Sequence, residues 1–291
     1  MPIYHVDPDI RKATTLPAEF YQSDNVFSAL KDQVFTQSWQ WLGDESLVPL
    51  NESVFPLFFM ENFLNEPMVL TRNATGSIGC LSNVCTHRAN LVVQHPGQQK
   101  ELMCQYHGRR FDIDGTFKSM PKFKEAVDFP RPCDDLARFP LHQWGPFLFA
   151  TIDPVFDFKI ITNKIEERIG FLPLDQFKPD TSLDKDYLIN CHWVFPNMMF
   201  NFYPWGLSIN VVQPINKEKT RVSFMSYVYD ESKLHSGAGA SLDKVEREDE
   251  FVVENVHRGL QSRVYQQGRF SPTMEQGVHY FHRLLADLVE I

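Results

Sequence analysis

The chain lacks the features that mark several large protein classes. Its longest nearly apolar stretches, 54–60 and 146–152, are too short to cross a bilayer and predict buried strands instead. Aspartate and glutamate number 37 against 28 lysines and arginines, and this net charge of -9 disfavours binding to nucleic acid or to an anionic membrane. Charges stand where a leader peptide needs an apolar core, so we expect a cytoplasmic protein. There is no internal repeat.

Cysteine is scarce and is not arranged as a disulfide framework. Of the five cysteines, Cys85 lies two residues before a histidine and Cys104 three residues before another, and Cys80, Cys133 and Cys191 remain. An odd remainder argues against paired disulfides and indicates reduced thiols. With 291 residues, 43% of them hydrophobic, the chain is long enough to bury two modest cores.

Two short Cys/His motifs carry the chemistry. Cys85 and His87 form a C-x-H pair, and Cys104 and His107 form a C-x2-H pair. Two thiolates with two imidazoles fit either a Cys2His2 zinc site or a Rieske 2Fe-2S cluster, in which two histidines replace two cysteines on one iron. A zinc finger pairs Cys with Cys and His with His, whereas each loop here supplies one of each. The spacing therefore favours the cluster, with zinc as the alternative.

These residues resemble a known family. The runs 85–88 and 104–115 are similar to the signature of Rieske non-heme iron oxygenase alpha subunits, the ring-hydroxylating dioxygenase family. Arg109 stands where the commonest pattern has Trp, and together with 121–123 it resembles the choline and glycine betaine monooxygenase-like branch. The resemblance implies a 2Fe-2S cluster, a mononuclear Fe(II), and a flavin or ferredoxin-type reductase as electron donor.

The predicted fold class is α+β. We expect an N-terminal helical segment (1–38), a small all-β Rieske domain (39–155), and a helix-grip catalytic domain (156–291) built from an antiparallel sheet and a long helix. Periodicity predicts helices over 24–37, 161–169 and 242–265, a further C-terminal helix, and two long strands over 198–213 and 220–230.

Asp249 interrupts an apolar stripe on the predicted helix 242–265. It lies between Val245 and Val252 on the face that also carries Val256, so its carboxylate should point towards the core. A buried carboxylate needs a cation, a hydrogen-bond network or a metal, and composition alone favours a salt bridge or a place near the helix N-terminus. The family resemblance instead implies that Asp249 is the carboxylate ligand of the mononuclear iron.

The two histidines that complete such a 2-His-1-carboxylate site are missing from the sequence. Residues 187–193 resemble the strand that enters the family's histidine segment, while 193–200 resemble a strand well beyond it, so the two are fused at Trp193. Either the native chain has a segment that this sequence omits, or the segment is deleted. We favour omission, because losing interior elements of one core should destabilise it.

Other histidines are weaker candidates for the iron. His279 and His282 lie three residues apart on the C-terminal helix and share one face, although packing histidines are commoner than ligands at such a spacing. His192, His235 and His257 are isolated. The family usually has Asn at the position of His192, which favours a hydrogen-bonding role for this residue.

The resemblance implies an oxygenase that uses reductase electrons and O2 to hydroxylate or N-demethylate a small organic substrate, as a homotrimer. Aromatic residues on one strand are candidates for a substrate pocket or for simple core packing: Phe200, Phe202, Tyr203 and Trp205. An aromatic cage for a quaternary ammonium is one use of such residues, and an aromatic substrate is another. The competing hypothesis is a non-catalytic Rieske electron-transfer protein on a degenerate oxygenase scaffold.

Overall fold

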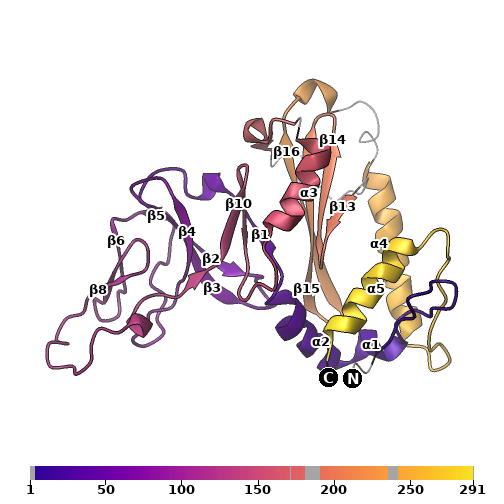
Figure 1. Ribbon diagram of the computed structural model, residues 1–291, viewed down its shortest axis with the longest axis horizontal. Coiled ribbons are helices and arrows are strands. Elements are labelled where there is room, and N and C mark those ends of the chain that lie inside the picture. The colour runs from indigo at the N-terminus through magenta and orange to yellow at the C-terminus, as the bar shows by residue number, and fades with distance from the viewer. Residues whose placement is uncertain (1–3, 171, 181–190, 235–241, 291) are drawn as a thin grey trace. The chain divides into compact units, whose positions relative to one another are not determined.

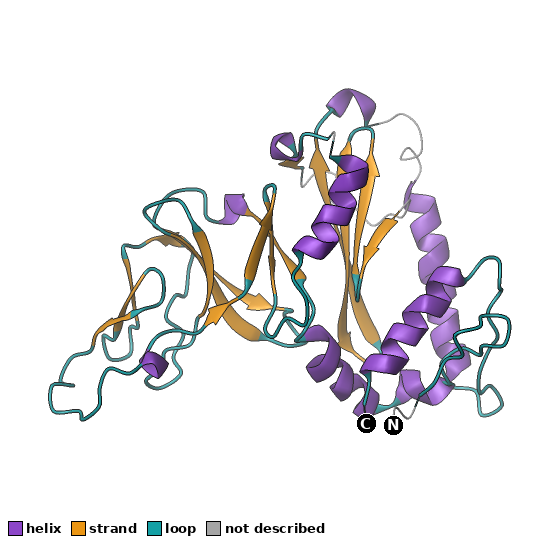
Figure 2. Cartoon of the chain, viewed as in Figure 1, coloured by secondary structure: helices purple, strands orange, loops and turns teal. Residues whose placement is uncertain are grey.

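The computed structural model describes residues 4–170, 172–180, 191–234 and 242–290 (Figures 1 and 2), with the side chains of 191–192 and 242–250 excepted. The chain forms two compact units. The first unit is Trp39–Glu166, and the second unit combines Met1–Ser38 with Glu167–Ile291. Within the described residues no helix is long and apolar enough to cross a membrane.

The first unit consists of three antiparallel sheets. Their strands, in spatial order, are β1 (Gln40–Asp44), β11 (Phe147–Ala150) and β10 (Leu141–Trp144); β5 (Gly97–Gln98), β2 (Ser53–Phe59), β3 (Glu66–Arg72), β4 (Ile78–Ser82) and β9 (Arg138–Phe139); and β6 (Glu101–Met103), β7 (Arg110–Asp112) and β8 (Phe117–Ser119). The predicted all-β domain is therefore present over this stretch. The turn between β7 and β8 is closed by Gly115 N–H, which donates to the Asp112 carbonyl at 2.9 Å.

The core of the first unit contains both motif cysteines. Cys85 and Cys104 pack with eight apolar residues, among them Leu102 and Phe111, neither of which exposes any surface. Leu81 of β4 precedes the first motif, and Leu102 and Phe111 lie on the strands on either side of the second, so burying these side chains also positions the two loops. The position of the motifs thus follows from ordinary hydrophobic packing.

The second unit is a five-stranded antiparallel sheet with helices (Figure 1). The strand order is β12 (Lys178–Pro179), β16 (Lys219–Val228), β15 (Gly206–Asn216), β14 (Met198–Tyr203) and β13 (Cys191–Val194), and the helices are α1 (Ala18–Gln22), α2 (Asp24–Leu30), the π-helical turn Lys31–Phe35, α4 (Leu242–Leu260) and α5 (Gln276–Leu288). Helix α3 (Lys159–Ile169) contains the boundary between the units. The α+β class is confirmed, as are the helices predicted near residues 24–37 and 161–169.

One predicted long strand is in fact a hairpin. Residues 198–213 form β14 and part of β15, which pair with each other through a tight turn at Pro204 and Trp205. Proline cannot donate a ladder hydrogen bond, and a Cβ atom at Gly206 would lie 2.1 Å from the Tyr227 carbonyl oxygen. The Pro-Trp-Gly sequence was the available signal for this turn.

A second hairpin forms where the two family-like segments are fused. Val194 pairs with Met198, so the chain reverses through residues 195–197 directly after β13. The ring of Trp193 packs against Phe281 of α5 at 4.7 Å, and Phe195 lies 5.9 Å from the same ring. The fused sequence therefore continues the sheet without an intervening helix.

The apolar stripe predicted for residues 242–265 does not face a core in the described part of that helix. The helix ends at Leu260, and within it Phe251 is 67% exposed while Val252 and Val256 are each 55% exposed. At β13 it is Phe281 of α5 that supplies the aromatic packing. The prediction of a buried stripe is thus wrong over residues 251–260, and Val245 lies among the side chains that are not described.

Candidate functional site

The two motif loops have the same backbone design. In the first, Cys85 N–H donates to the Asn90 carbonyl (2.9 Å) and Ala89 N–H donates to the Cys85 carbonyl (3.0 Å). In the second, Cys104 N–H donates to the Arg109 carbonyl (2.8 Å) and Gly108 N–H donates to the Cys104 carbonyl (3.0 Å). The fourth residue after each cysteine has a positive φ, 54° at Ala89 and 72° at Gly108. Each loop is thereby closed into a tight turn.

The four motif side chains lie as a sulfur pair and an imidazole pair. Cys85 and Cys104 are both buried and share a hydrogen bond between their thiols. The rings of His87 and His107 lie edge to face with their centroids 4.9 Å apart, His87 half-buried and His107 exposed. The loops thus gather four side chains from two places in the sequence, with sulfur towards the core and nitrogen towards the surface.

This separation fits a two-iron cluster better than zinc. A structural zinc needs four ligands around one ion. Among the described residues, however, no three His, Cys, Asp or Glu side chains are grouped to hold a single ion. A Rieske cluster takes only two residues on each iron, which is the arrangement of a thiol pair beside an imidazole pair. The donor set therefore fits the cluster.

The surroundings of the sulfur atoms favour thiolate at one position. Burial raises the pKa of Cys85, and its hydrogen bond to Cys104 adds to this effect. Burial also opposes ionisation of Cys104, but backbone N–H groups of the loop and the Asn90 amide, 3.6 Å from Sγ, hold the pKa of Cys104 below its usual value. Donors aimed at sulfur are the protein's means of tuning an iron–sulfur cluster.

An ion pair lies behind the second loop. The side chain of Arg109 is 2% exposed, and its Nη2 donates to Asp134 Oδ1 at 2.6 Å and to the Asp134 carbonyl at 3.2 Å. Burial opposes ionisation of Asp134, but the hydrogen bonds from Arg109 and from Arg131 N–H hold the pKa of Asp134 below its usual range. Sequence analysis missed Asp134, since nothing near it in the sequence marks it as a partner of Arg109.

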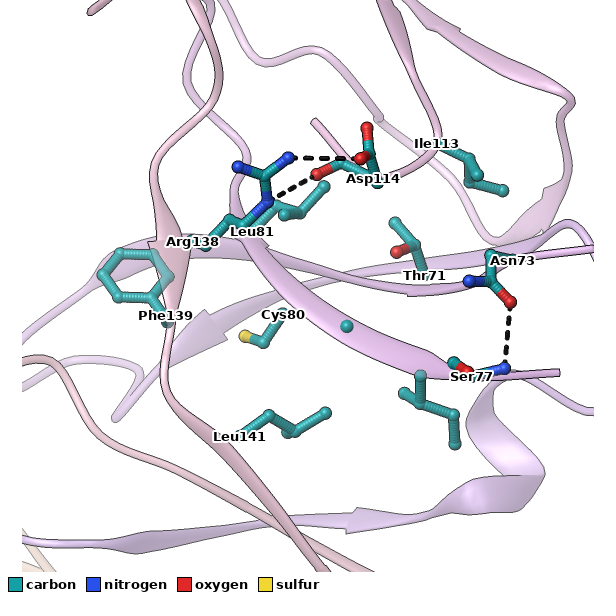
Figure 3. Close-up of a pocket in the computed structure, with 12 residues that line it drawn as sticks. Thr71, Asn73, Ser77, Cys80, Leu81, Ile113, Asp114, Arg138, Phe139 and Leu141 are labelled. Carbon is teal, nitrogen blue, oxygen red and sulfur yellow. Dashed lines mark hydrogen bonds and ion pairs between the residues drawn. The ribbon is translucent and has the colours of Figure 1, made fainter. Parts of the chain in front are cut away.

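An open pocket also lies in the first unit (Figure 3). Its lining includes Cys80, Thr71 and Asn73, and Arg138 pairs with Asp114 at its edge (3.2 Å). None of the four motif residues lines it. Burial raises the pKa of Cys80 to about 12, so this thiol is protonated at neutral pH and is a poor nucleophile there.

The second unit does not show a site for a mononuclear iron within its described residues. Asp249 belongs to α4, but its side chain lies outside the described residues. His235 lies outside them altogether, as does the side chain of His192, and His257 is half-buried near the end of α4. The described side chains of the second unit therefore do not by themselves supply a ligand set for this iron.

His279 and His282 contact the N-terminal segment. His279 is buried and its Nε2 lies 2.7 Å from the Asp7 carbonyl oxygen. His282 Nδ1 accepts a hydrogen bond from Leu16 N–H at 3.5 Å, and its Nε2 lies 3.3 Å from the Tyr21 hydroxyl. His279 and His282 thus lie on one face of α5, as predicted, and this face binds the N-terminal segment through Asp7, Leu16 and Tyr21.

The aromatic residues proposed for a pocket do not form one wall. Phe200 and Phe202 are two residues apart on β14 and share one face of the sheet. Tyr203 is an odd number of residues from both, so its side chain lies on the other face. Tyr203 instead stacks on Trp205, with centroids 4.8 Å apart and planes 6° from parallel, and this pair packs with Val228 and Leu234.

Two family models match the chain. The ring hydroxylating alpha subunit (catalytic domain) matches residues 93–291, and the Rieske [2Fe-2S] domain matches residues 38–140. Among curated proteins, choline monooxygenase, chloroplastic, of Beta vulgaris is 21% identical (99% of this chain, 80% of the relative). The carnitine monooxygenase oxygenase subunit of Escherichia coli K12 is 24% identical (96% and 94%).

Solved structures share the fold. The apo form of the quaternary ammonium Rieske monooxygenase CntA superposes with a TM-score of 0.75 at 21% identity, covering 98% of this chain and 97% of that one. Naphthalene 1,2-dioxygenase with bound indole gives 0.65 at 13% identity, covering 95% and 92%. The fold, with a Rieske domain and a catalytic domain, is therefore shared with these enzymes.

The alignments also measure what this chain lacks. The carnitine monooxygenase subunit aligns over 358 positions, whereas this chain has 291 residues, so at least 67 positions of the alignment face no residue here. A segment missing near Trp193 would account for such a shortfall.

We predict that His282 makes the stability of the second unit depend on pH. Burial lowers the pKa of His282, the nearby His279 lowers it further, and Glu275 acts in the opposite direction. Below the unfolded-state value of about 6.5 the unfolded chain then binds more protons, so stability falls as pH falls through that value towards the lower folded value. Urea unfolding at several pH values should show a weaker dependence in His282→Gln.

The control is His5→Gln, which changes an exposed histidine in the same unit. It should keep the acid sensitivity of the wild type. An identical pH dependence in the wild type and in His282→Gln would contradict the assignment.

Proposed function

The chain belongs to the family of ring-hydroxylating alpha subunits, and on that premise we propose that Cys85, Cys104, His87 and His107 bind its 2Fe-2S cluster. The observation that carries this assignment is the separation into a buried thiol pair and an outer imidazole pair. Cys85 and Cys104 would hold one iron and the two histidines the other.

As a member of this family the protein is a Rieske non-heme iron oxygenase, whose cofactors are a 2Fe-2S cluster and a mononuclear iron. The match extends over the catalytic domain, so the alternative of a degenerate electron carrier is not supported. When bound, the cluster supplies a one-electron store. The chain's own part is to hold the sulfur ligands in a dry core and to present His107 at the surface, where a reductase of the flavin or ferredoxin type would deliver electrons.

We predict that Cys85→Ser abolishes cluster binding. Serine keeps the size of the side chain but does not supply the thiolate that iron requires. Bound iron should fall by about two atoms per chain, because each cluster holds two irons, and the electron paramagnetic resonance signal of the reduced cluster should disappear.

Cys133→Ser is the matched control, since Cys133 is an exposed thiol outside the core that holds the ligands. It should load and reduce like the wild type. Stoichiometric zinc in the wild type, with no signal after reduction, would overturn the cluster assignment.

For the catalytic iron we infer that Asp249 is the carboxylate ligand and that the two histidines belong to a segment inserted near Trp193 in the native gene product. The support is the alignment shortfall of at least 67 positions, together with the exposed apolar face of α4. A helix that carries Phe251 and Val252 in water lacks the partner that its sequence pattern indicates.

The intact mass of the protein expressed from its native gene tests this inference. The 291-residue chain has a mass of 33.9 kDa, and we expect a heavier chain that binds a third iron. Asp249→Ala in that chain should lose the third iron and all turnover while keeping the cluster signal. A native mass of 33.9 kDa would refute the insertion, and unchanged turnover in Asp249→Ala would refute the ligand role.

We propose a small quaternary ammonium compound as the substrate. The relatives include choline and carnitine monooxygenases, and CntA has been solved with γ-butyrobetaine and with L-carnitine. In this chain the stacked rings of Tyr203 and Trp205 are the candidate contact for the cation. A homotrimer is the assembly that we expect from the family.

The prediction is that the native gene product binds choline or carnitine about tenfold more tightly than the uncharged analogue with a tert-butyl group. The two have the same shape, and a desolvated cation–π contact contributes about 1–2 kcal/mol. Calorimetry measures both affinities, and Trp205→Leu should reduce the difference. Equal affinities for the charged and uncharged compounds would remove the quaternary ammonium from consideration.

A further inference from the structure

Asp134 joins the two ligand loops through a single carbonyl group. Thr86, which lies between the two ligands of the first loop, donates its hydroxyl to the Asp134 carbonyl at 2.8 Å. Arg109, two residues beyond His107, donates Nη2 to the same carbonyl at 3.2 Å and to the Asp134 carboxylate at 2.6 Å. No strand ladder connects Thr86 with Arg109, so Asp134 cross-links the two loops by accepting hydrogen bonds from both residues.

The guanidinium at this junction lies among aromatic rings. Its central carbon is 4.9 Å from the ring centroid of Phe117, 5.5 Å from that of Phe129 and 5.7 Å from that of Phe111. These rings exclude water from a charge that is almost fully buried. A charge in such surroundings is weakly screened and acts over a longer distance than one at the surface.

The aromatic wall continues to one of the ligands. Phe129 contacts Phe123 (5.0 Å between centroids), and Phe123 stands perpendicular to the ring of His87 at 5.6 Å. The region between the guanidinium and the imidazole pair is therefore filled by protein on this side. Arg110, the next residue, differs in that it is exposed and pairs with Glu101 at the surface.

We propose that Arg109 and Asp134 are positioning residues that brace the two ligand loops and set the reduction potential of the cluster, an inference that rests on the cluster assignment proposed above. The cation of Arg109 stabilises the electron that reduction adds, and the anion of Asp134 opposes it. The potential is thus set by the balance of two opposite charges held in one dry contact.

The two single substitutions have opposite predicted effects. Arg109→Gln removes the cation and lowers the potential, whereas Asp134→Asn removes the anion and raises it. Each changes the equilibrium constant for reduction by about tenfold, or about 59 mV for a one-electron couple, as expected for the loss of one weakly screened unit charge. The double variant returns close to the wild-type potential.

The measurement is a potentiometric titration of the loaded protein, followed by the electron paramagnetic resonance signal of the reduced cluster. Arg110→Gln is the matched control, because it removes the same charge from a solvated position and leaves the potential within a small shift of the wild type. Arg109→Lys keeps the charge but not the fork of donors, so it holds the potential nearer to the wild type than Arg109→Gln does and loses cluster faster on dilution.

The outcomes separate the inference from its premise. A wild type without a reducible Rieske signal overturns the cluster assignment and this inference with it. A normal wild-type signal with both single variants shifted in the same direction, or with Arg110→Gln shifted as far as Arg109→Gln, overturns the inference alone. If Arg109→Gln fails to load, Asp134→Asn decides, and an unchanged potential there refutes the role in setting it.

Discussion

The first unit depends on one constraint, which is that the four proposed cluster ligands must be held as two unlike pairs. Sulfur that is buried with Leu102 and Phe111 is shielded from water, while the imidazole pair reaches the surface at His107. Two loops of the same backbone geometry achieve this, each closed by hydrogen bonds from and to its cysteine. Because each loop supplies one member of each pair, each pair forms only when both loops are in place. A cluster bound to the four side chains would therefore also link two parts of the fold.

The sequence was sufficient where the chemistry is local. The mixed Cys/His motifs identified the four side chains that the structure brings together, because thiolates and imidazoles at that spacing have few other uses. The α+β class and the main helices followed from periodicity. The Asp134 contact could not be predicted, since it joins residues distant in sequence that follow no repeat. The hairpin at Pro204 was predicted as continuous strand, although Pro and Gly mark it.

His279 and His282 show why spacing alone does not identify a ligand. Two histidines three residues apart lie on one helical face whether they bind iron or receive hydrogen bonds. Only the partners distinguish these roles, and here the partners are the backbone at Asp7 and Leu16. The same limit applied to α4, where an amphipathic pattern indicates a buried face but does not say which segment covers it. In this chain the pattern is present and Phe251 is exposed.

The exposed face of α4 affects how a preparation of this protein should be judged. A large apolar side chain that stays in water forgoes about 1.5–3 kcal/mol of stabilisation, and several of them lie together on this helix. The lost stabilisation concerns the second unit, which contains α4, whereas the proposed cluster ligands lie in the first unit. Stability is thus unevenly distributed along the chain. The colour of a cluster-loaded sample would report that the Cys/His loops are intact, but it would not report whether the apolar face of α4 is covered.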